Sequence, residues 1–442
     1  MTLKEHYKKN IVLAYPVILS QLGHITVSVA DSVMVGQLGP IPLASVSLAL
    51  SVVTLFMLFG IGASYGMTPL VAAADGANDK KSAASILKNG LVYSTILGIL
   101  LLVFSLLAEQ VFPFLGQEKE VVSGALPFYR VVGISLLPLM LFQGFRQFAE
   151  GLSMTRQAMV ISIAGNVLNV FLNYVFIFGH FGCPALGMVG AGYATLISRV
   201  VQAIAMGVFV VRYHRFRRYV SVLDSIEIEW KVIKRILRIG GPTGLQFVFE
   251  IGAFSASAIM VGWLGALPLA AHQIAMNLSA ITYMTATGIA SAASIRVANQ
   301  LGRKDEHNLM LAGKTCFIMT VALMAFYSLL LVLGRHWLPQ LYVDNQEVIE
   351  IASVLLVIVA LYQISDGVQT VGLGVLRGLA DVKVPTYVTL VTYWVIAIPV
   401  GYVCAFVFEW GSAGVWVGLL VGLTLAAVAH LYRFRQLVKS RF

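Results

Sequence analysis

Long apolar stretches dominate the pattern along the chain, and short polar segments rich in glycine, proline and charge separate them. A stretch of roughly 20 apolar residues is long enough to cross a bilayer as a helix. Twelve stretches of this kind fall near residues 10–36, 43–71, 84–108, 121–145, 156–178, 187–212, 232–262, 268–296, 309–333, 347–376, 384–408 and 413–434. The pattern therefore predicts twelve transmembrane helices.

The composition supports this prediction. Of the 442 residues, 59% are hydrophobic and only 11% are charged, whereas a soluble domain has about 25% charged residues. One buried core is too small to hold so many apolar residues, so a large part of the protein surface must face hydrocarbon. The first apolar stretch resembles a signal peptide after Lys4, Lys8 and Lys9. It continues too far for one, and we interpret it as an uncleaved first span. The sequence thus predicts an all-α integral membrane protein.

The distribution of positive charge predicts the orientation. Of 30 Lys and Arg residues, Lys119 and Arg335 fall in loops on one side of the predicted membrane, and Arg130 and Arg199 fall within spans. All the others lie at the opposite side, which the positive-inside rule identifies as cytoplasmic. Both termini are then cytoplasmic, in a plasma membrane of the bacterial inner-membrane type. The formal net charge of +10 is accounted for by orientation, so we expect no nucleic-acid partner.

The second half of the sequence repeats the first at a constant shift of 226 residues. Pro16 falls on Pro242, and Met34-Val35-Gly36 falls on Met260-Val261-Gly262. Further pairs at this shift continue over about seventy residues, which is hard to obtain by chance. Gly151-Leu152 returns at a shift of 227, and Gly187 and Gly190 return at a shift of 224.

The repeat predicts two lobes of six helices each, related by a pseudo-twofold axis along the membrane normal. We expect an N-terminal lobe at residues 1–212, a cytoplasmic linker at 213–231 and a C-terminal lobe at 232–442. Parallel repeats of this kind are a known transporter architecture, with the binding site between the lobes near the midplane. The alternative is a repeat that is only structural, as in a channel or a scaffold.

Three acidic residues lie inside predicted spans: Asp31, Glu250 and Asp366. A carboxylate within a bilayer costs at least about 2.5–3.5 kcal/mol, so each is a candidate for binding an ion or a substrate. Glu250 follows Arg238 by about 18 Å of helix, and Asp366 precedes Arg377 by about 17 Å. Both carboxylates are therefore expected at a similar depth, and they can share one cation if the seventh and tenth spans are neighbours.

Neighbouring side chains favour the pair in the second half. Tyr362 lies one helical turn before Asp366, and Gln246 lies one turn before Glu250. Oxygen ligands from Glu250, Asp366 and Tyr362 suit Na⁺, while two close carboxylates can instead hold a proton. The residues permit either ion. The alternative role for each acid is a structural hydrogen bond to a neighbouring helix, or an ion pair with Arg130 or Arg199.

Asp31 is expected about 10 Å further outward than Glu250. Asn166, Asn169 and Asn173 follow a helical spacing and line one face of the fifth span. We expect these amides to form hydrogen bonds with Asp31, although they can equally well join two helices.

Two more polar residues have open roles. His24 occupies the repeat position of Glu250, where it is either a proton relay or a satisfied buried histidine. Asp344 lies in an outer loop, where a solvated side chain is the simpler interpretation. The roles of His24, Arg130 and Arg199 stay open.

Several enzyme motifs are absent from the sequence. The segment Asn308–Thr315 ends in Ala-Gly-Lys-Thr but lacks the first glycine of a Walker A motif. There is no zinc motif and no nucleophile elbow, and Cys183, Cys316 and Cys404 have no metal-ligand spacing. We therefore expect neither an enzyme nor a cofactor.

Several motifs together resemble one family over essentially the whole chain. They are Pro16 with Ala30-Asp31-Ser32-Val33-Met34-Val35-Gly36, Gly241-Pro242 with Glu250 and Met260-Val261-Gly262, and Tyr362-Gln363-Ile364-Ser365-Asp366-Gly367 followed by Leu376-Arg377-Gly378-Leu379. In order and spacing they are similar to the multidrug and toxic compound extrusion (MATE) family, in its NorM-like branch. One departure is the first-half loop Glu150–Arg156, which is less regular than its repeat.

The resemblance implies two six-helix lobes around a V-shaped cleft, and a monomer in the membrane lipid. It implies export of cationic, often aromatic, compounds by antiport with Na⁺ or H⁺. Cation coupling is implied for Glu250, Asp366 and Tyr362, with Asp31 as the acid of the N-terminal lobe. Substrate contacts are expected at residues Asp31, Asn169, Asn173, Gln246, Asp366 and Asp344.

Our hypothesis from the sequence is alternating access, in which a cationic drug and the coupling ion bind these acids in turn. The first rival is a flippase for lipids or lipid-linked sugars, which would favour a basic cleft for phosphate. The second is a membrane-embedded enzyme, which would need an acidic metal-binding cluster. The sequence does not distinguish Na⁺ from H⁺ as the coupling ion.

Overall fold

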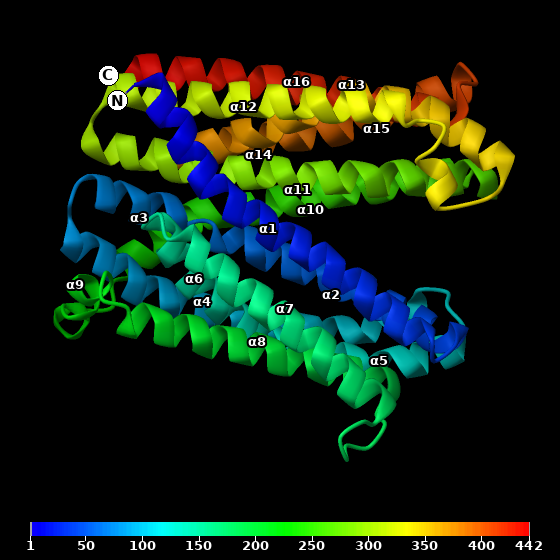
Figure 1. Ribbon diagram of the computed structural model, residues 1–442, viewed down its shortest axis with the longest axis horizontal. Helices are drawn as coiled ribbons and strands as arrows, with labels where there is room; N and C mark the ends of the chain where they lie inside the picture. Colours follow the sequence, from blue (N-terminus) through cyan, green and yellow to red (C-terminus); the bar gives the residue numbers. More distant parts are fainter. Residues whose placement is uncertain (1, 442) are drawn as a thin grey trace. The chain divides into compact units, whose positions relative to one another are not determined.

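The computed structural model describes residues 2–441, and this part of the chain is helical with no β-strand (Figure 1). Twelve helical segments in it are long and apolar enough to cross a membrane. They are Leu3–Gly36, Pro40–Gly76, Lys80–Phe114, Lys119–Gly151, Thr155–Phe178, Gly187–Arg212, Trp230–Gly262, Ala266–Arg303, Glu306–Leu333, Gln346–Gly378, Lys383–Val407 and Gly411–Ser440. The predicted number of spans is confirmed, and each predicted span overlaps one of these segments.

Some spans consist of more than one helix. The α-helices are α1 (Leu3–Gly36), α2 (Pro40–Ser64), α3 (Met67–Gly76), α4 (Lys80–Ala108), α5 (Lys119–Ile134), α6 (Leu136–Gly151), α7 (Thr155–Phe178), α8 (Gly187–Arg212), α9 (Arg217–Val220), α10 (Trp230–Gly262), α11 (Ala266–Arg303), α12 (Glu306–Leu333), α13 (Gln346–Gly378), α14 (Lys383–Leu390), α15 (Ile398–Tyr402) and α16 (Gly411–Arg441). Short 3₁₀ segments η1 (Glu109–Phe114), η2 (Leu223–Ser225) and η3 (Pro339–Leu341) and the π-helices η4 (Val391–Ala397) and η5 (Val403–Val407) complete them.

The backbone follows the sequence repeat closely. Gly39 and Gly265, which are 226 residues apart, precede α2 and α11 with φ angles of 119° and 120°. Asp79 and Asp305, at the same shift, cap α4 and α12 by accepting hydrogen bonds from backbone amides three residues later. Gly187 and Gly411, with φ angles of 57° and 58°, repeat at the shift of 224. The two halves therefore share loop conformations as well as residues.

The chain packs into two compact units, and the boundaries between them do not coincide with the predicted linker. The first packing unit comprises the chain up to Ile18 together with the chain from Leu245 onward, and the second comprises Leu19–Gly244. Each boundary falls inside a long helix, α1 or α10, two residues after Pro16 or Pro242. Proline removes one hydrogen bond of the helix interior, so a helix bends most easily there. The lobes at residues 1–212 and 232–442 stay a prediction.

In the first packing unit, α13 packs against α11, α12 and α16. Its core contains the buried side chains of Leu355, Val359, Trp416 and Leu423. The chain begins and ends at the same end of this unit (Figure 1), as an even number of spans requires. Helix α13 is thus the central helix of the unit and provides a rigid support for polar groups.

A buried polar network fixes the beginning of α1 in the first packing unit. The Arg296 guanidinium on α11 lies 2.8 Å from His6 Nδ1 and donates to Asn10 Oδ1 over 3.3 Å. Asn10 Nδ2 in turn donates to Thr315 Oγ1 on α12 over 2.8 Å. Buried polar groups must find such partners, which explains why this part of α1 packs with the helices of the second repeat.

In the second packing unit, α6 packs against α3, α4 and α8, while α7 packs against α8. The predicted linker packs on this unit as well. Its side chains Phe216, Tyr219 and Ile226 are buried, and Lys88 Nζ donates to the carbonyl oxygens of Leu223 and Ile226 over 3.1 and 2.7 Å. The linker is therefore an ordered part of this unit.

Helix α10 enters the second packing unit through direct backbone contact. A Cβ added at Gly240 would lie 2.1 Å from the carbonyl oxygen of Ala63, and one added at Gly66 would lie 2.4 Å from that of Ile236. Only glycine permits this approach, because side chains at these positions would push the backbones apart.

We expect Gly240→Ala to destabilise the protein, whereas Gly241→Ala should not. Overpacking typically costs about 1–3 kcal/mol, and the new Cβ meets a carbonyl that moves only with its helix. At Gly241 the added Cβ meets only Leu237 Cδ1 at 3.6 Å, and alanine is the better helix former. Thermal unfolding of the purified chain in detergent measures both. Equal unfolding temperatures would contradict the backbone contact.

Candidate cation and substrate sites

The first packing unit contains two buried carboxylates, on two different helices. Glu250 lies on α10, eight residues after Pro242, and Asp366 lies on α13. Their residues are 5% and 4% exposed, and the two carboxylates interact electrostatically. Gln369 on α13 also donates a hydrogen bond to Glu250, so the helices that carry the two acids are neighbours, which was the condition for a shared cation.

Glu250 is held by uncharged donors. Its Oε1 accepts hydrogen bonds from Gln246 Nε2 over 3.2 Å and from Gln369 Nε2 over 3.0 Å. Its Oε2 accepts a longer one from the Tyr283 hydroxyl on α11, over 3.4 Å. Three helices thus orient this carboxylate while leaving its charge unbalanced by these contacts.

Tyr362 lies one turn before Asp366 on α13 and is 2% exposed. Its ring packs edge-on against Trp416 with centroids 5.4 Å apart, and the Trp416 indole donates to His272 Nδ1 over 3.1 Å. In the part of the chain that the structure describes, no group donates a hydrogen bond to the Asp366 carboxylate. Tyr362 interacts electrostatically with both Asp366 and Glu250, so the three residues expected from the sequence lie in one region of this unit.

The chemistry of this cluster suits a cation. A buried carboxylate is costly unless a counter-charge or a proton accompanies it. Two carboxylates and a phenol offer the oxygen ligands that hard cations prefer, and the amides of Gln246 and Gln369 cannot neutralise them. The arrangement suits one small cation or the positive group of a larger molecule.

Asp31 occupies a separate polar site in the second packing unit. Asn173 Nδ2 on α7 donates a hydrogen bond to Asp31 Oδ1. In the amide orientation that satisfies both of its polar atoms, Asn169 donates to the same oxygen over 3.1 Å and accepts from the Thr195 amide on α8 over 3.3 Å. Asn166, on the same face, has a buried Nδ2 without a hydrogen-bond partner among the described residues. Two of the three predicted asparagines thus bind Asp31.

Comparison with known proteins assigns the chain to one family. The family model described as MatE matches residues 16–175 and again residues 242–403. The second match begins 226 residues after the first, which is the shift of the sequence repeat. The chain belongs to the MatE family.

Relatives and solved structures agree with this assignment. The chain is 31% identical to the probable multidrug resistance protein NorM of Idiomarina loihiensis, over 98% of this chain and 95% of that protein. It is 32% identical to the probable multidrug resistance protein NorM of Agrobacterium fabrum, over 98% and 94%. A crystal structure of MATE in the bent conformation superimposes with a TM-score of 0.91 at 20% identity, covering 100% of this chain and 98% of that one. The resemblance drawn from the motifs and the predicted fold class are confirmed.

Not every predicted site residue of this MatE protein joins these two clusters. Asp344 is exposed in the segment before α13, and Asp366 lies about 30 Å further along that helix. Arg130 forms an ion pair with Glu109 rather than with any of the three acids. His24 is exposed on α1 and forms no hydrogen bond in the described part of the chain.

The sequence analysis missed two hydrogen-bond donors to Glu250, Gln369 and Tyr283. Gln369 lies three residues after Asp366, so helical spacing alone was enough to find it. Tyr283 on α11 gave no such signal, because the packing of α10 against α11 decides its contact.

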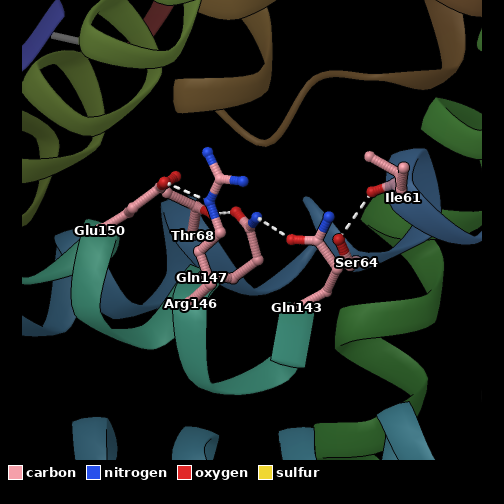
Figure 2. Close-up of polar contacts among 7 residues, drawn as sticks. All are labelled: Ile61, Ser64, Thr68, Gln143, Arg146, Gln147 and Glu150. Carbon is pink, nitrogen blue, oxygen red and sulfur yellow. Dashed lines mark hydrogen bonds and ion pairs between the residues drawn. The ribbon is translucent and has the colours of Figure 1, made fainter. Parts of the chain in front are cut away.

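Sequence reasoning also missed a buried polar cluster between α2, α3 and α6 (Figure 2). Arg146 Nε donates to Glu150 Oε1 over 2.7 Å, with side chains 7% and 4% exposed. Next to this ion pair, Thr68 donates to Gln147, and Gln147 Nε2 donates to Gln143 Oε1 over 3.3 Å. The residues that recur one helical turn apart on α6 therefore form a structural network in this family member.

Proposed function

We propose that this protein is a multidrug efflux transporter that exports organic cations by antiport with Na⁺ or H⁺. The observation that supports it most is the buried pair Glu250 and Asp366. The hydrogen-bond donors to Glu250 are all uncharged, and Asp366 accepts no hydrogen bond among the described residues. The two relatives named NorM are described as probable multidrug resistance proteins, which supports this substrate class. As part of the proposal, the protein is a monomer in the plasma membrane with both termini in the cytoplasm.

Coupling follows from competition between two positive ligands. Antiport requires that the drug and the coupling ion oppose each other energetically through the same or linked sites. A cation bound at Glu250, Asp366 and Tyr362 removes the charge that attracts a drug, and release of that cation restores it. Alternating exposure of the sites to the two sides of the membrane then turns this competition into transport.

Each cluster has its part in this proposal. Glu250, Asp366 and Tyr362 bind the coupling ion, and Asp31 contributes a second acid. The drug, a cationic and often aromatic molecule, is proposed to contact Asp31, Asn169, Asn173, Gln246, Asp366 and the peripheral Asp344.

Accumulation of ethidium in cells that express the protein tests the function. We expect lower accumulation than in cells with empty vector, and we expect accumulation to rise when the driving ion is removed. Omission of Na⁺ and addition of an uncoupler are separate arms, because they distinguish the two ions. Equal accumulation in expressing and control cells, for ethidium and a fluoroquinolone alike, would refute the proposal.

We expect Asn173→Ala to reduce efflux of cationic drugs by roughly tenfold or more. A hydrogen bond to a charged group contributes about 1.5–3 kcal/mol, and Asn173 donates one to Asp31. Asn166→Ala is the matched control, since the Asn166 Nδ2 has no hydrogen-bond partner within the described residues. Efflux rates at equal expression provide the measurement. Equal rates in the two variants would exclude a role of the Asn173 contact.

A further inference from the structure

Arg199 is a charged residue in the middle of a membrane span. It lies on α8, twelve residues after Gly187 and thirteen before Arg212, so each end of the helix is about 18–20 Å away. Ionisable residues at such depth are rare and face the protein interior or a water-filled space. The residues around Arg199 therefore indicate what its charge binds.

The Arg199 side chain points to the inner face of α8. The opposite face is apolar and exposed, as expected where lipid surrounds the helix. Its exposed residues are Ile197, Val200, Val201, Ile204, Val208 and Val211. The residues that share the face of Arg199 are buried, among them Ala203, Met206 and Val210. Arg199 is nevertheless only half-buried, so part of its surface stays accessible on the inner face of the second packing unit.

The guanidinium has few partners, and none of them is charged. One amino group donates to Ser135 Oγ over 2.6 Å, and the other lies 3.2 Å from Met57 Sδ. Arginine has five N–H donors, so three remain without a partner among the described residues. No carboxylate of the described chain comes within ion-pair distance of Arg199, although Asp31 of the same unit interacts with it electrostatically.

We infer that Arg199 is a specificity-determining residue that binds the carboxylate of a zwitterionic substrate whose cationic group binds at Asp31. This inference rests on the proposed function and narrows its substrate class. The second packing unit presents one accessible cation and one acid, and a molecule with both charges satisfies each of them. A planar guanidinium with free N–H groups matches a carboxylate in geometry as well as in charge.

The choice of a carboxylate partner follows from the contacts. Asp31 already accepts hydrogen bonds from two asparagine amides, so it is positioned independently of Arg199. A simple cation would gain from Asp31 but would be repelled by Arg199. A zwitterion is favoured by both residues, and the structure therefore predicts discrimination between the two classes of molecule.

A matched pair of ligands tests this inference. A fluoroquinolone with a free carboxylate and its methyl ester share the aromatic system and the cationic amine. Binding to the purified full-length protein is measured by fluorescence polarisation of the compound itself, and transport is measured in proteoliposomes. We expect the wild type to bind the acid more tightly than the ester.

Arg199→Gln should weaken binding of the acid by at least about tenfold, as expected for the loss of a charge-assisted hydrogen bond. Binding of the ester should change less than about twofold or become tighter. Arg199→Lys, which keeps the charge, should retain part of the preference. Arg130→Gln is the matched control, because Arg130 pairs with Glu109 at the protein surface and should leave both ligands unaffected.

The outcomes separate the inference from the proposed function. Equal losses for acid and ester in Arg199→Gln, or no loss for either, would overturn the role of Arg199. If Arg199→Gln does not fold, the comparison of acid and ester on the wild type decides, and equal affinities overturn the inference. If the wild type transports the ester and shows no preference for the acid, the proposed efflux function is retained and the role of Arg199 is overturned. A wild type that exports ethidium but neither of these two compounds overturns the inference alone, and one that exports none of the three overturns both.

Discussion

Glu250→Gln and Asp366→Asn should each abolish ion-driven drug efflux while the protein is still produced at normal levels. Each substitution keeps the shape of the side chain and removes the negative charge that a cation requires. Glu250 accepts hydrogen bonds from uncharged groups on three helices, so the neutral amide can still be accommodated in the fold. Ion-driven ethidium efflux from proteoliposomes measures the effect, and we expect rates at background.

The control variants for this experiment are Glu227→Gln and Asp224→Asn. Both residues are exposed in the ordered segment before α10, so their charges contribute to no buried cluster. We expect efflux in both to equal that of the wild type. Normal efflux in both Glu250→Gln and Asp366→Asn would remove the proposed mechanism, since no other buried pair of acids in the described chain offers the same chemistry.

Glu150→Gln should destabilise the protein by about 3–5 kcal/mol, the cost of leaving one member of a buried ion pair without its partner. Glu150 and Arg146 are almost fully buried (Figure 2), so water cannot replace the lost charge. Thermal unfolding of the purified chain gives the measurement. We expect a much lower unfolding temperature than in the wild type.

Glu109→Gln provides the control for burial, because the Arg130 and Glu109 side chains are 56% and 22% exposed. An exposed pair contributes about 0–1 kcal/mol, so this variant should unfold near the wild-type temperature. The double variant Arg146→Met with Glu150→Leu should recover much of the loss, since well-packed apolar residues can replace a buried pair. Similar unfolding temperatures for Glu150→Gln and Glu109→Gln would show that burial does not govern these pairs.

The local positions of the site residues were predictable from the sequence. Helical rise placed Glu250 and Asp366 at one depth, and helical spacing put Asn169 and Asn173 on the face that binds Asp31. The same spacing identifies Gln369 as a neighbour of Asp366. The asparagine prediction agrees with the contacts in the structure because it depends only on helix geometry within one span, whereas the common depth of Glu250 and Asp366 stays a prediction.

Contacts between spans were harder to predict. Tyr283 and Glu250 meet across α10 and α11, and the buried Arg146–Glu150 pair on α6 lies next to Thr68 of α3 (Figure 2). The sequence also allowed an ion pair between Arg199 and one of the three acids, whereas in the structure its hydrogen bonds go to Ser135 and Met57 and to no carboxylate of the described chain. Such contacts depend on how helices rotate and cross, which periodicity along one helix does not specify.

The sequence by itself determined the number of spans, the repeat and the acids within the membrane, because apolar length, a constant shift and the cost of a buried charge can be recognised along one chain. Only the tertiary structure decided which helices pack together. It assigns the first part of α1 and the first part of α10 to different packing units than the rest of each helix. The physical reason is that buried polar partners such as Arg296 and close backbone contacts such as Gly240 with Ala63 act between segments far apart in sequence. Their energies favour one packing arrangement among many that the same apolar pattern allows.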